Sequence, residues 1–383
     1  MSVTSARGFK AAGIAAGIKQ NGKRDLALVV NEGPLRAAAG VFTSNRVQAA
    51  PVQWSRQVLA DGELGAVVLN SGGANACTGP RGVQDTYATA ERAAGRLGLA
   101  AADVAVCSTG LIGVPLPMDR VLAGVESAAD RLSETGGQDA ALAVMTTDTV
   151  HKTAAVTRGG WTVGGMAKGA GMLAPGLATM LVVLTTDAVV DSAGLDRALR
   201  DATRLTFDRL DSDGCMSTND TVLLLASGAS RLAPEQGEFA DAVQAVCADL
   251  ARQLIGDAEG ASKEIRIEVV GAASEDDAVE VGRSVARNNL LKCAIHGEDP
   301  NWGRVLSAIG TTSAVFEPEQ LDVAINDVWV CKNGSVGEDR ALVDMSGRAV
   351  GITVDLGAGP HGAVIWSNDL TADYVHENSE YAS

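Results

Sequence analysis

Residues 168–184 read Lys168-Gly-Ala-Gly-Met-Leu-Ala-Pro-Gly-Leu-Ala178-Thr179-Met-Leu-Val-Val-Leu184, a loop bearing glycine and proline that runs into an apolar strand. A threonine stands at the junction. If the bond between Ala178 and Thr179 is cut, Thr179 carries a nucleophilic hydroxyl and a free α-amine that can act as its base. The alternative is an ordinary strand residue, because threonine favours strands and Ala-Thr pairs also occur at residues 88–89 and 202–203.

The composition is that of a large globular chain. At 383 residues, 46% of them hydrophobic, the chain is long enough for two domains with sizeable cores. A net charge of −16 argues against a nucleic-acid partner, which needs a basic surface. The N-terminus has no apolar signal core, and no segment approaches the roughly 18 apolar residues of a membrane span. We therefore expect a cytoplasmic protein with no membrane partner.

The cysteines are widely spaced and form no CxxC pair: Cys77, Cys107, Cys215, Cys247, Cys293 and Cys331. This spacing predicts incidental thiols, with neither a disulfide framework nor a zinc site. Four histidines occur, none in a nucleophile or metal signature, and the HExxH, GxSxG and P-loop patterns are absent. We expect no metal and no resident cofactor.

Strands and helices alternate irregularly, which predicts a mixed α/β fold. The predicted strands are 65–70, 104–108, 161–167, 180–185, 265–270, 323–332, 351–356 and 363–366. The predicted helices are 85–97, 119–132, 195–205, 239–254 and 277–290. A GxGxxG match at 357–362 is interpreted as a turn between strands, because a strand pattern follows it where a dinucleotide site needs a helix.

An N-terminal threonine nucleophile needs a base, an oxyanion hole and substrate contacts. The α-amine supplies the base, with an unperturbed pKa of about 7.7–8.0. Thr109-Gly110 follows the strand 104–108 and is a candidate oxyanion hole, although a plain strand end is the alternative. Lys168, Glu259 and the tail 378–383 are candidate contacts for a zwitterionic substrate, each with a solvated surface residue as the alternative.

Together these segments resemble the ornithine acetyltransferase family, also called bifunctional glutamate N-acetyltransferases. The resemblance covers essentially the whole chain. Its matching segments are 8–19, 42–46, 50–51, 70–76, 108–110, 145–149, 168–181, 217–221, 259–263, 297–304, 369–371 and 374–375. It implies an αββα sandwich similar to N-terminal-nucleophile folds. It also implies self-cleavage into intertwined chains, 1–178 and 179–383, assembled as α2β2 or larger.

The resemblance also implies a function for named residues. Thr179 takes the acetyl group of N-acetylornithine and passes it to glutamate, as a step of arginine biosynthesis. Thr109 and Gly110 match the oxyanion-hole pair. The substrate contacts that match are Thr147 (with Thr146 as the alternative), Lys168, Glu259, Asn378 and Ser383. Acetyl-CoA is a possible second donor, and no residue here discriminates the two donors.

The sequence departs from the family pattern at Gly73, Cys215, His296 and the pair His376-Glu377. None of these removes a matched catalytic group. Three other functions stay open at this stage. Water as the acceptor gives an amidase or aminopeptidase, a related enzyme of another pathway uses other acyl donors, and an uncleaved chain is a silent binding protein.

Overall fold

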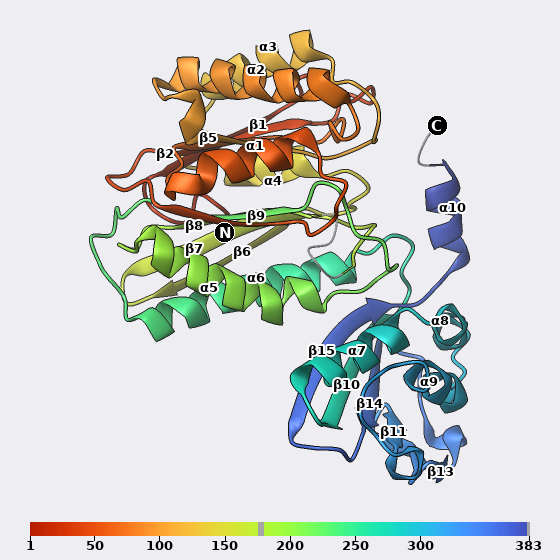
Figure 1. Cartoon of the computed structure of the whole chain (residues 1–383). Helices are drawn as coiled ribbons and strands as arrows, with labels where there is room; N and C mark the ends of the chain where they lie inside the picture. The colour runs from red at the N-terminus through yellow and green to blue at the C-terminus, as the bar shows by residue number, and fades with distance from the viewer. Residues whose placement is uncertain (175–179, 381–383) are drawn as a thin grey trace. The chain divides into compact units, whose positions relative to one another are not determined.

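The computed structural model describes residues 1–174 and 180–380, which divide into two compact units (Figure 1). The first unit comprises residues 1–208 and 215–254, and the second comprises 209–214 and the chain from residue 255 onward. Ala178, Thr179 and Ser383 lie outside the described residues. The boundary between residues 178 and 179 does not separate compact units, because strands from both sides of it share one sheet.

The first sheet of the first unit has the strand order β1-β2-β4-β5, with only β4 and β5 parallel among the three pairs. Its strands are β1 (Phe9–Ile14), β2 (Leu26–Asn31), β4 (Ala66–Asn70) and β5 (Val104–Ser108). Helices α2 (Gly79–Leu97) and α3 (Met118–Ala129) cover its outer face (Figure 1). Small side chains on α2 allow close packing there, since Ala90 and Ala93 are fully buried.

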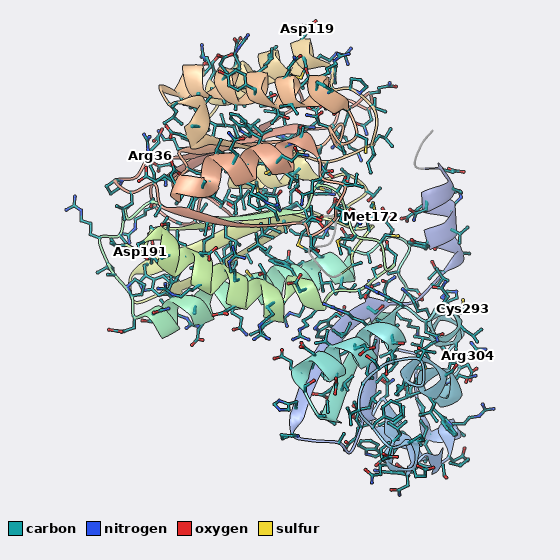
Figure 2. The ribbon with its side chains drawn as sticks, viewed as in Figure 1. Arg36, Asp119, Met172, Asp191, Cys293 and Arg304 are labelled. Atoms are coloured by element: carbon teal, nitrogen blue, oxygen red, sulfur yellow. The ribbon has the colours of Figure 1, made fainter. Side chains whose placement is uncertain are left out.

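The second sheet has the order β3-β9-β8-β7-β6 and contains strands from before and after residue 178. Its strands are β3 (Ala38–Phe42), β9 (Thr221–Ala226), β8 (Leu181–Thr186), β7 (Trp161–Lys168) and β6 (Lys152–Arg158). Helices α5 (Ser192–Leu205) and α6 (Gln236–Gly256) lie on its outer face (Figure 1). Asp191 caps α5 by accepting a 2.7 Å hydrogen bond from the Gly194 amide (Figure 2).

A common apolar core joins the inner faces of the two sheets. Helix α4 (Gly137–Val144) enters this layer and packs on β1 and β2 through alanines such as Ala140 and Ala141. Helix α1 (Ala50–Val58) packs against β5 and α2. The αββα layering is confirmed, with one alanine-rich helix between the sheets.

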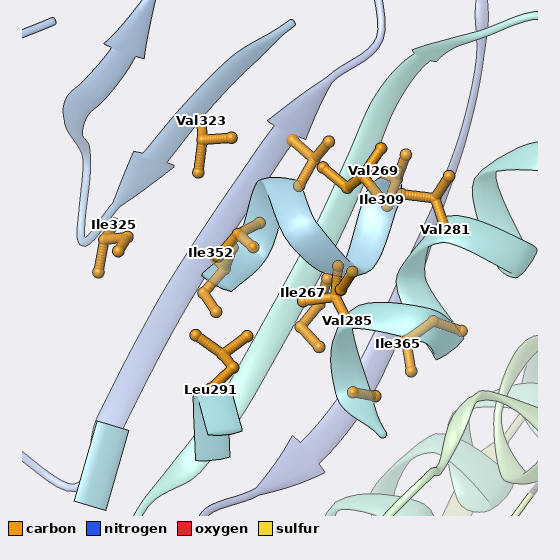
Figure 3. Packing of buried hydrophobic residues seen from close by; sticks show 14 of the residues in the cluster. Ile267, Val269, Val281, Val285, Leu291, Ile309, Val323, Ile325, Ile352 and Ile365 are labelled. Atoms are coloured by element: carbon orange, nitrogen blue, oxygen red, sulfur yellow. The ribbon is translucent and has the colours of Figure 1, made fainter. Parts of the chain in front are cut away.

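The second unit has one sheet of order β13-β12-β11-β14-β10-β15. Its strands are β10 (Glu264–Ala272), β11 (Asp322–Ile325), β12 (Val328–Lys332), β13 (Ser335–Val336), β14 (Ala349–Asp355) and β15 (His361–Asn368). Its helices are α7 (Glu275–Ala286), α8 (Asn289–His296), α9 (Trp302–Ile309) and α10 (Ala372–Glu380). Aliphatic side chains of α7 and α9, such as Val281 and Ile309, meet Ile267 and Ile352 of the sheet (Figure 3).

Short 3₁₀ helices of the described chain occupy Leu59–Asp61, Ala101–Asp103, Phe207–Arg209, Pro318–Gln320 and Arg340–Leu342.

Two predicted elements were wrong because turn signals within them were missed. The strand predicted over 323–332 is two strands, β11 and β12, joined by Asn326 and Asp327 with positive φ angles of 44° and 66°. The helix predicted over 277–290 is α7 followed by α8, because Asn288 caps a new helix through the Leu291 amide at 2.9 Å. The turn at 357–362 is confirmed between β14 and β15.

Candidate active site

The first sheet ends in a constrained turn after β5. The Thr109 amide donates to the Asn70 carbonyl at 3.0 Å, so this amide is already used within the fold. Gly110 follows with a φ of +131°, and a Cβ atom there would stand 2.7 Å from the Gly73 nitrogen. Only glycine fits such a position. The Gly110 amide makes no hydrogen bond to any residue in 1–174 or 180–380.

Lys168 ends β7 and is buried, with 1% of its surface exposed. Its Nζ atom donates a 3.3 Å hydrogen bond to the Thr109 hydroxyl oxygen. The alternative interpretation of Lys168 as a solvated surface residue is therefore wrong. The structure brings Lys168 and Thr109 together, although they are 59 positions apart in the sequence.

Asp148 holds the lysine end of β7 in place. One of its carboxylate oxygens accepts from Lys152 Nζ at 2.7 Å and from the Gly169 amide at 2.7 Å. The other accepts from the Thr146 amide at 2.9 Å. Burial alone would raise the pKa of Asp148, but the charges of Lys168 and Lys152 and these hydrogen bonds outweigh it and lower that pKa to about 2.

The turn 145–149 is where a substrate-contacting threonine was predicted. The hydrogen bond from the Thr146 amide to the Asp148 carboxylate closes this turn. Thr147 lies between these two residues and is half-buried. Lys19 supports the same turn by donating to the Met145 carbonyl at 2.6 Å. Burial, with Lys168 nearby, lowers the pKa of Lys19 to about 8. Lys19 was missed because its surroundings come from residues about 125 positions away.

The strand β8 begins directly after the presumed cleavage point. Leu181 is the register partner of Lys168 across the antiparallel pair β7 and β8. The Met180 amide donates to Asp220 Oδ1 at 3.0 Å. On the other side of that point, Met172 takes a positive φ of 54° and marks a turn (Figure 2). Thr179 and Ala178 themselves are outside the described residues.

Two other predicted substrate contacts, Glu259 and Asn378, belong to the second unit and lie within the described residues. Glu259 is half-buried, and its Oε2 atom accepts from Asn378 Nδ2 of α10 at 2.9 Å. The two side chains therefore meet although they are far apart in sequence. Asn378 is exposed.

A Ser-His-Asp cluster, which the sequence did not predict, also lies in the second unit. His296 Nδ1 is 3.0 Å from Asp369 Oδ2 and 3.2 Å from the Ser262 hydroxyl. A catalytic relay needs the serine and the aspartate on different ring nitrogens, and here both lie at Nδ1. Asp369 also accepts from the Ser262 and Lys263 amides at 2.9 Å each, so the cluster anchors the strand that follows Glu259.

The cysteines and the groups of acidic side chains are the other candidates for a reactive or metal-binding centre. None of the six cysteines, all of which lie in the described part of the chain, forms a disulfide bond. Burial raises the pKa of the Cys107 thiol to about 12, which keeps it protonated near neutral pH. Cys293 is exposed on α8 (Figure 2). Within residues 1–174 and 180–380, no group of acidic, histidine or cysteine side chains is arranged to bind a metal. No helix in that part of the chain is long and apolar enough to cross a membrane.

The two facing sheets and the buried cluster at their ends define a layered α/β enzyme fold. The chain belongs to the ArgJ family, whose model matches residues 10–383. Two similar relatives carry the name arginine biosynthesis bifunctional protein ArgJ. One, from Streptomyces avermitilis, is 76% identical over 100% of both chains, and the other, from Thermobifida fusca, is 62% identical over 100% of both.

A solved structure is also similar in sequence: ornithine acetyltransferase of Mycobacterium tuberculosis, complexed with ornithine. It is 58% identical with a TM-score of 0.45, and the match covers 47% of this chain and 96% of that one.

Proposed function

We propose that this chain cuts itself before Thr179 and transfers an acetyl group from N-acetylornithine to glutamate, giving ornithine and N-acetylglutamate. The observation that carries the proposal is the 3.3 Å contact between Lys168 Nζ and the Thr109 hydroxyl, beside the start of β8. The names of its relatives support arginine biosynthesis, and the solved relative is an ornithine acetyltransferase complexed with ornithine.

The chemistry follows from an N-terminal threonine. The Thr179 hydroxyl attacks the acetyl carbonyl carbon and gives its proton to the α-amine. The C–N bond then breaks, the same proton goes to the departing amine of ornithine, and the acetyl group remains as an ester on Thr179. The amine of glutamate attacks that ester and loses a proton through the same base, which releases N-acetylglutamate and restores the hydroxyl.

The contact from Lys168 gives Thr109 a defined role in this scheme. An ammonium group only donates, so the Thr109 oxygen must accept from Lys168 and its own O–H is left to point elsewhere. A hydroxyl fixed in this way is a donor for a developing oxyanion. The amide of Gly110 is the second donor, since it makes no hydrogen bond within the described residues. One such donor contributes about 10²–10³ to the rate.

The recognition groups are assigned by charge. Glu259 suits the side-chain ammonium of ornithine, with Asn378 orienting its carboxylate. Lys168, Thr147 and Ser383 complete the contacts carried by the family resemblance. The cleaved chains are proposed to stay together as α2β2 or larger, in the cytoplasm, without a resident cofactor.

The test begins with the mass of the purified protein under denaturing conditions. We expect two species, residues 1–178 and 179–383, and acetyl transfer from N-acetylornithine that needs glutamate. Release of acetate without glutamate would assign an amidase, and transfer from acetyl-CoA would add a second donor. One intact chain without transfer would contradict the proposal.

Replacement of the nucleophile is the first mutational prediction. Thr179→Ala should leave one uncut chain and no measurable transfer, because the same hydroxyl serves both steps. Thr157→Ala, at an exposed threonine of β6 in the same sheet, is the matched control and should cut and transfer as the parent does. A cut and active Thr179→Ala protein would remove Thr179 from the site.

A further inference from the structure

Lys19 lies in the loop between β1 and β2, is half-buried and has no part in the reaction scheme above. Its backbone amide donates to Asp25 Oδ2 at 2.8 Å, which fixes the base of this loop. Its Nζ atom donates to the Met145 carbonyl at 2.6 Å and to the Arg24 carbonyl at 3.2 Å. The side chain of Lys19 therefore reaches the turn 145–149.

The contact between Lys19 and Met145 is also a helix cap. Met145 is the residue after α4, and the carbonyls at the end of a helix need donors from outside it. Ser71 supplies one such donor, since its hydroxyl donates to the Ala143 carbonyl at 2.6 Å. A neutral hydroxyl is therefore sufficient to cap this end of α4, and a lysine brings a charge that capping alone does not require.

The charge of Lys19 is incompletely compensated. Its ammonium group has three N–H donors, and among the described residues it meets two carbonyl oxygens and forms no ion pair with a carboxylate. Burial and the charges of Lys168 and Lys23 lower its pKa to about 8, although Asp25 and Asp148 act in the opposite direction. A half-buried ammonium that is repelled by a second lysine favours an anion as its partner.

The two arginines around this loop have acceptors within the chain. Arg24 donates to the Gly13 carbonyl at 3.2 Å and pairs with Asp139 at 3.0 Å. Arg120 of α3 donates to the Gly17 carbonyl. Lys19 is therefore the cation of this loop that is best suited to an anionic ligand.

We propose that Lys19 is a positioning residue for substrate binding: its ammonium group holds the turn 145–149, and together with Lys168 it supplies the positive charge that attracts the α-carboxylate of the substrate. This inference rests on the proposed function. The α-carboxylate is common to N-acetylornithine and glutamate, so Lys19 serves both halves of the reaction. Thr147, the proposed contact in that turn, is two positions from the carbonyl that Lys19 binds.

The first test is Lys19→Met, which keeps an unbranched apolar side chain and removes the charge and the N–H donors. We expect self-cleavage as in the parent, a KM raised about tenfold for N-acetylornithine and for glutamate, and a kcat changed less than about twofold. Lys23→Met is the matched control, because it removes an exposed charge of the same loop that also acts on Lys19. It should keep both KM values within about twofold of the parent.

A pH series separates the charge of Lys19 from its structural contact. N-acetylornithine has no group that titrates between pH 7 and pH 9. Because the pKa of Lys19 is about 8, its charge is present at pH 7 and largely lost at pH 9, so the KM of the parent for N-acetylornithine should rise about fivefold over this range. Lys19→Arg stays charged at both pH values, and its KM should rise less than about twofold.

The outcomes separate this inference from the function on which it rests. A parent protein that neither cuts nor transfers contradicts the proposed function, and with it the role of Lys19. An active parent whose KM values are unchanged in Lys19→Met overturns only the role of Lys19. An equal rise of KM with pH in Lys19→Arg and the parent overturns it as well, because the charge of residue 19 would then not matter. If Lys19→Met does not fold, the pH series with Lys19→Arg decides alone.

Discussion

Asp148 and Asp220 are two buried carboxyl groups of the first unit that both interact with the charge of Lys168, yet their pKa values shift in opposite directions. Asp148 accepts two backbone hydrogen bonds and an ion pair from Lys152. Asp220 accepts a backbone hydrogen bond from Met180 and leaves one oxygen without a partner among the described residues. Burial raises both pKa values, and only at Asp148 do the charges of Lys168 and Lys152, together with the hydrogen bonds, outweigh it.

This difference separates two uses of a buried acid. A carboxylate such as Asp148, which accepts several hydrogen bonds, stabilises the fold through its ion pair with the buried Lys152. An incompletely satisfied one such as Asp220 destabilises the fold, because its buried Oδ2 atom has no hydrogen-bond partner among the described residues. Removing the charge should therefore weaken the protein at one position and not at the other.

The largest expected effect on stability is that of Asp148→Asn. It removes the carboxylate charge that pairs with Lys152, whose side chain is 0% exposed, and loss of one partner of a buried pair costs about 3–5 kcal/mol. The measurement is thermal unfolding in a Thr179→Ala background, where the chain is expected to stay in one piece. Asp196→Asn, which breaks the exposed pair with Arg200, should cost less than about 1 kcal/mol. Equal losses in the two variants would contradict the assigned role of Asp148.

A smaller change in the free energy of unfolding is expected when the pH is varied. The pKa of Asp148 falls from 3.8 to about 2 on folding, so this group contributes about 2 kcal/mol above pH 4, and that contribution is lost as the pH falls toward 2. The pKa of Asp220 rises on folding, so the native state binds the extra proton and the contribution of this group to stability declines as the pH rises above 3.8.

The two groups can be separated by their variants over the range from pH 3 to 8. Relative to the Thr179→Ala background, the deficit of Asp148→Asn should shrink as the pH falls below 4. Asp220→Asn should gain in relative stability as the pH rises from 4. Parallel curves for the two variants would show that the acids do not differ in charge.

Much of the fold followed from local pattern. The strand 104–108 agrees with β5 at both ends, and the face of helix 239–254 that carries Phe239, Val243 and Leu250 is buried as its spacing predicted. Strands with little alternation were missed, such as β9 (Thr221–Ala226), because a short apolar run does not distinguish a strand from a buried helix.

The site was predictable only where a motif was continuous. Thr109-Gly110 and Lys168 came from such segments, and the structure brings Thr109 and Lys168 into contact. The surroundings of Asp148 and Asp220 were not predicted, although both residues stand in segments that match the family. Their significance lies in partners about 20 and 40 positions away, Gly169 and Met180, and no local spacing reveals which buried oxygens remain unsatisfied.

A third carboxylate, Glu259 in the second unit, differs from Asp148 and Asp220 because it is only half-buried. Glu259→Gln should change stability by less than about 0.5 kcal/mol, since its bond to Asn378 is exposed to water. In the proposed reaction it should raise the KM for N-acetylornithine about tenfold, because a hydrogen bond to a charged group contributes about 1.5–3 kcal/mol. The KM for glutamate, which has no side-chain ammonium, should stay the same or fall.

Steady-state kinetics, with each substrate varied in turn, measure the two KM values that test this prediction. Glu377→Gln is the matched control, because Glu377 is a neighbouring acid whose pKa is raised by burial and by the charge of Glu259. It should leave the ratio of the two KM values unchanged. An equal rise of both KM values in Glu259→Gln would mean that Glu259 shapes the pocket but does not bind the side-chain ammonium of ornithine. The substrate preference would then have to come from groups other than this carboxylate.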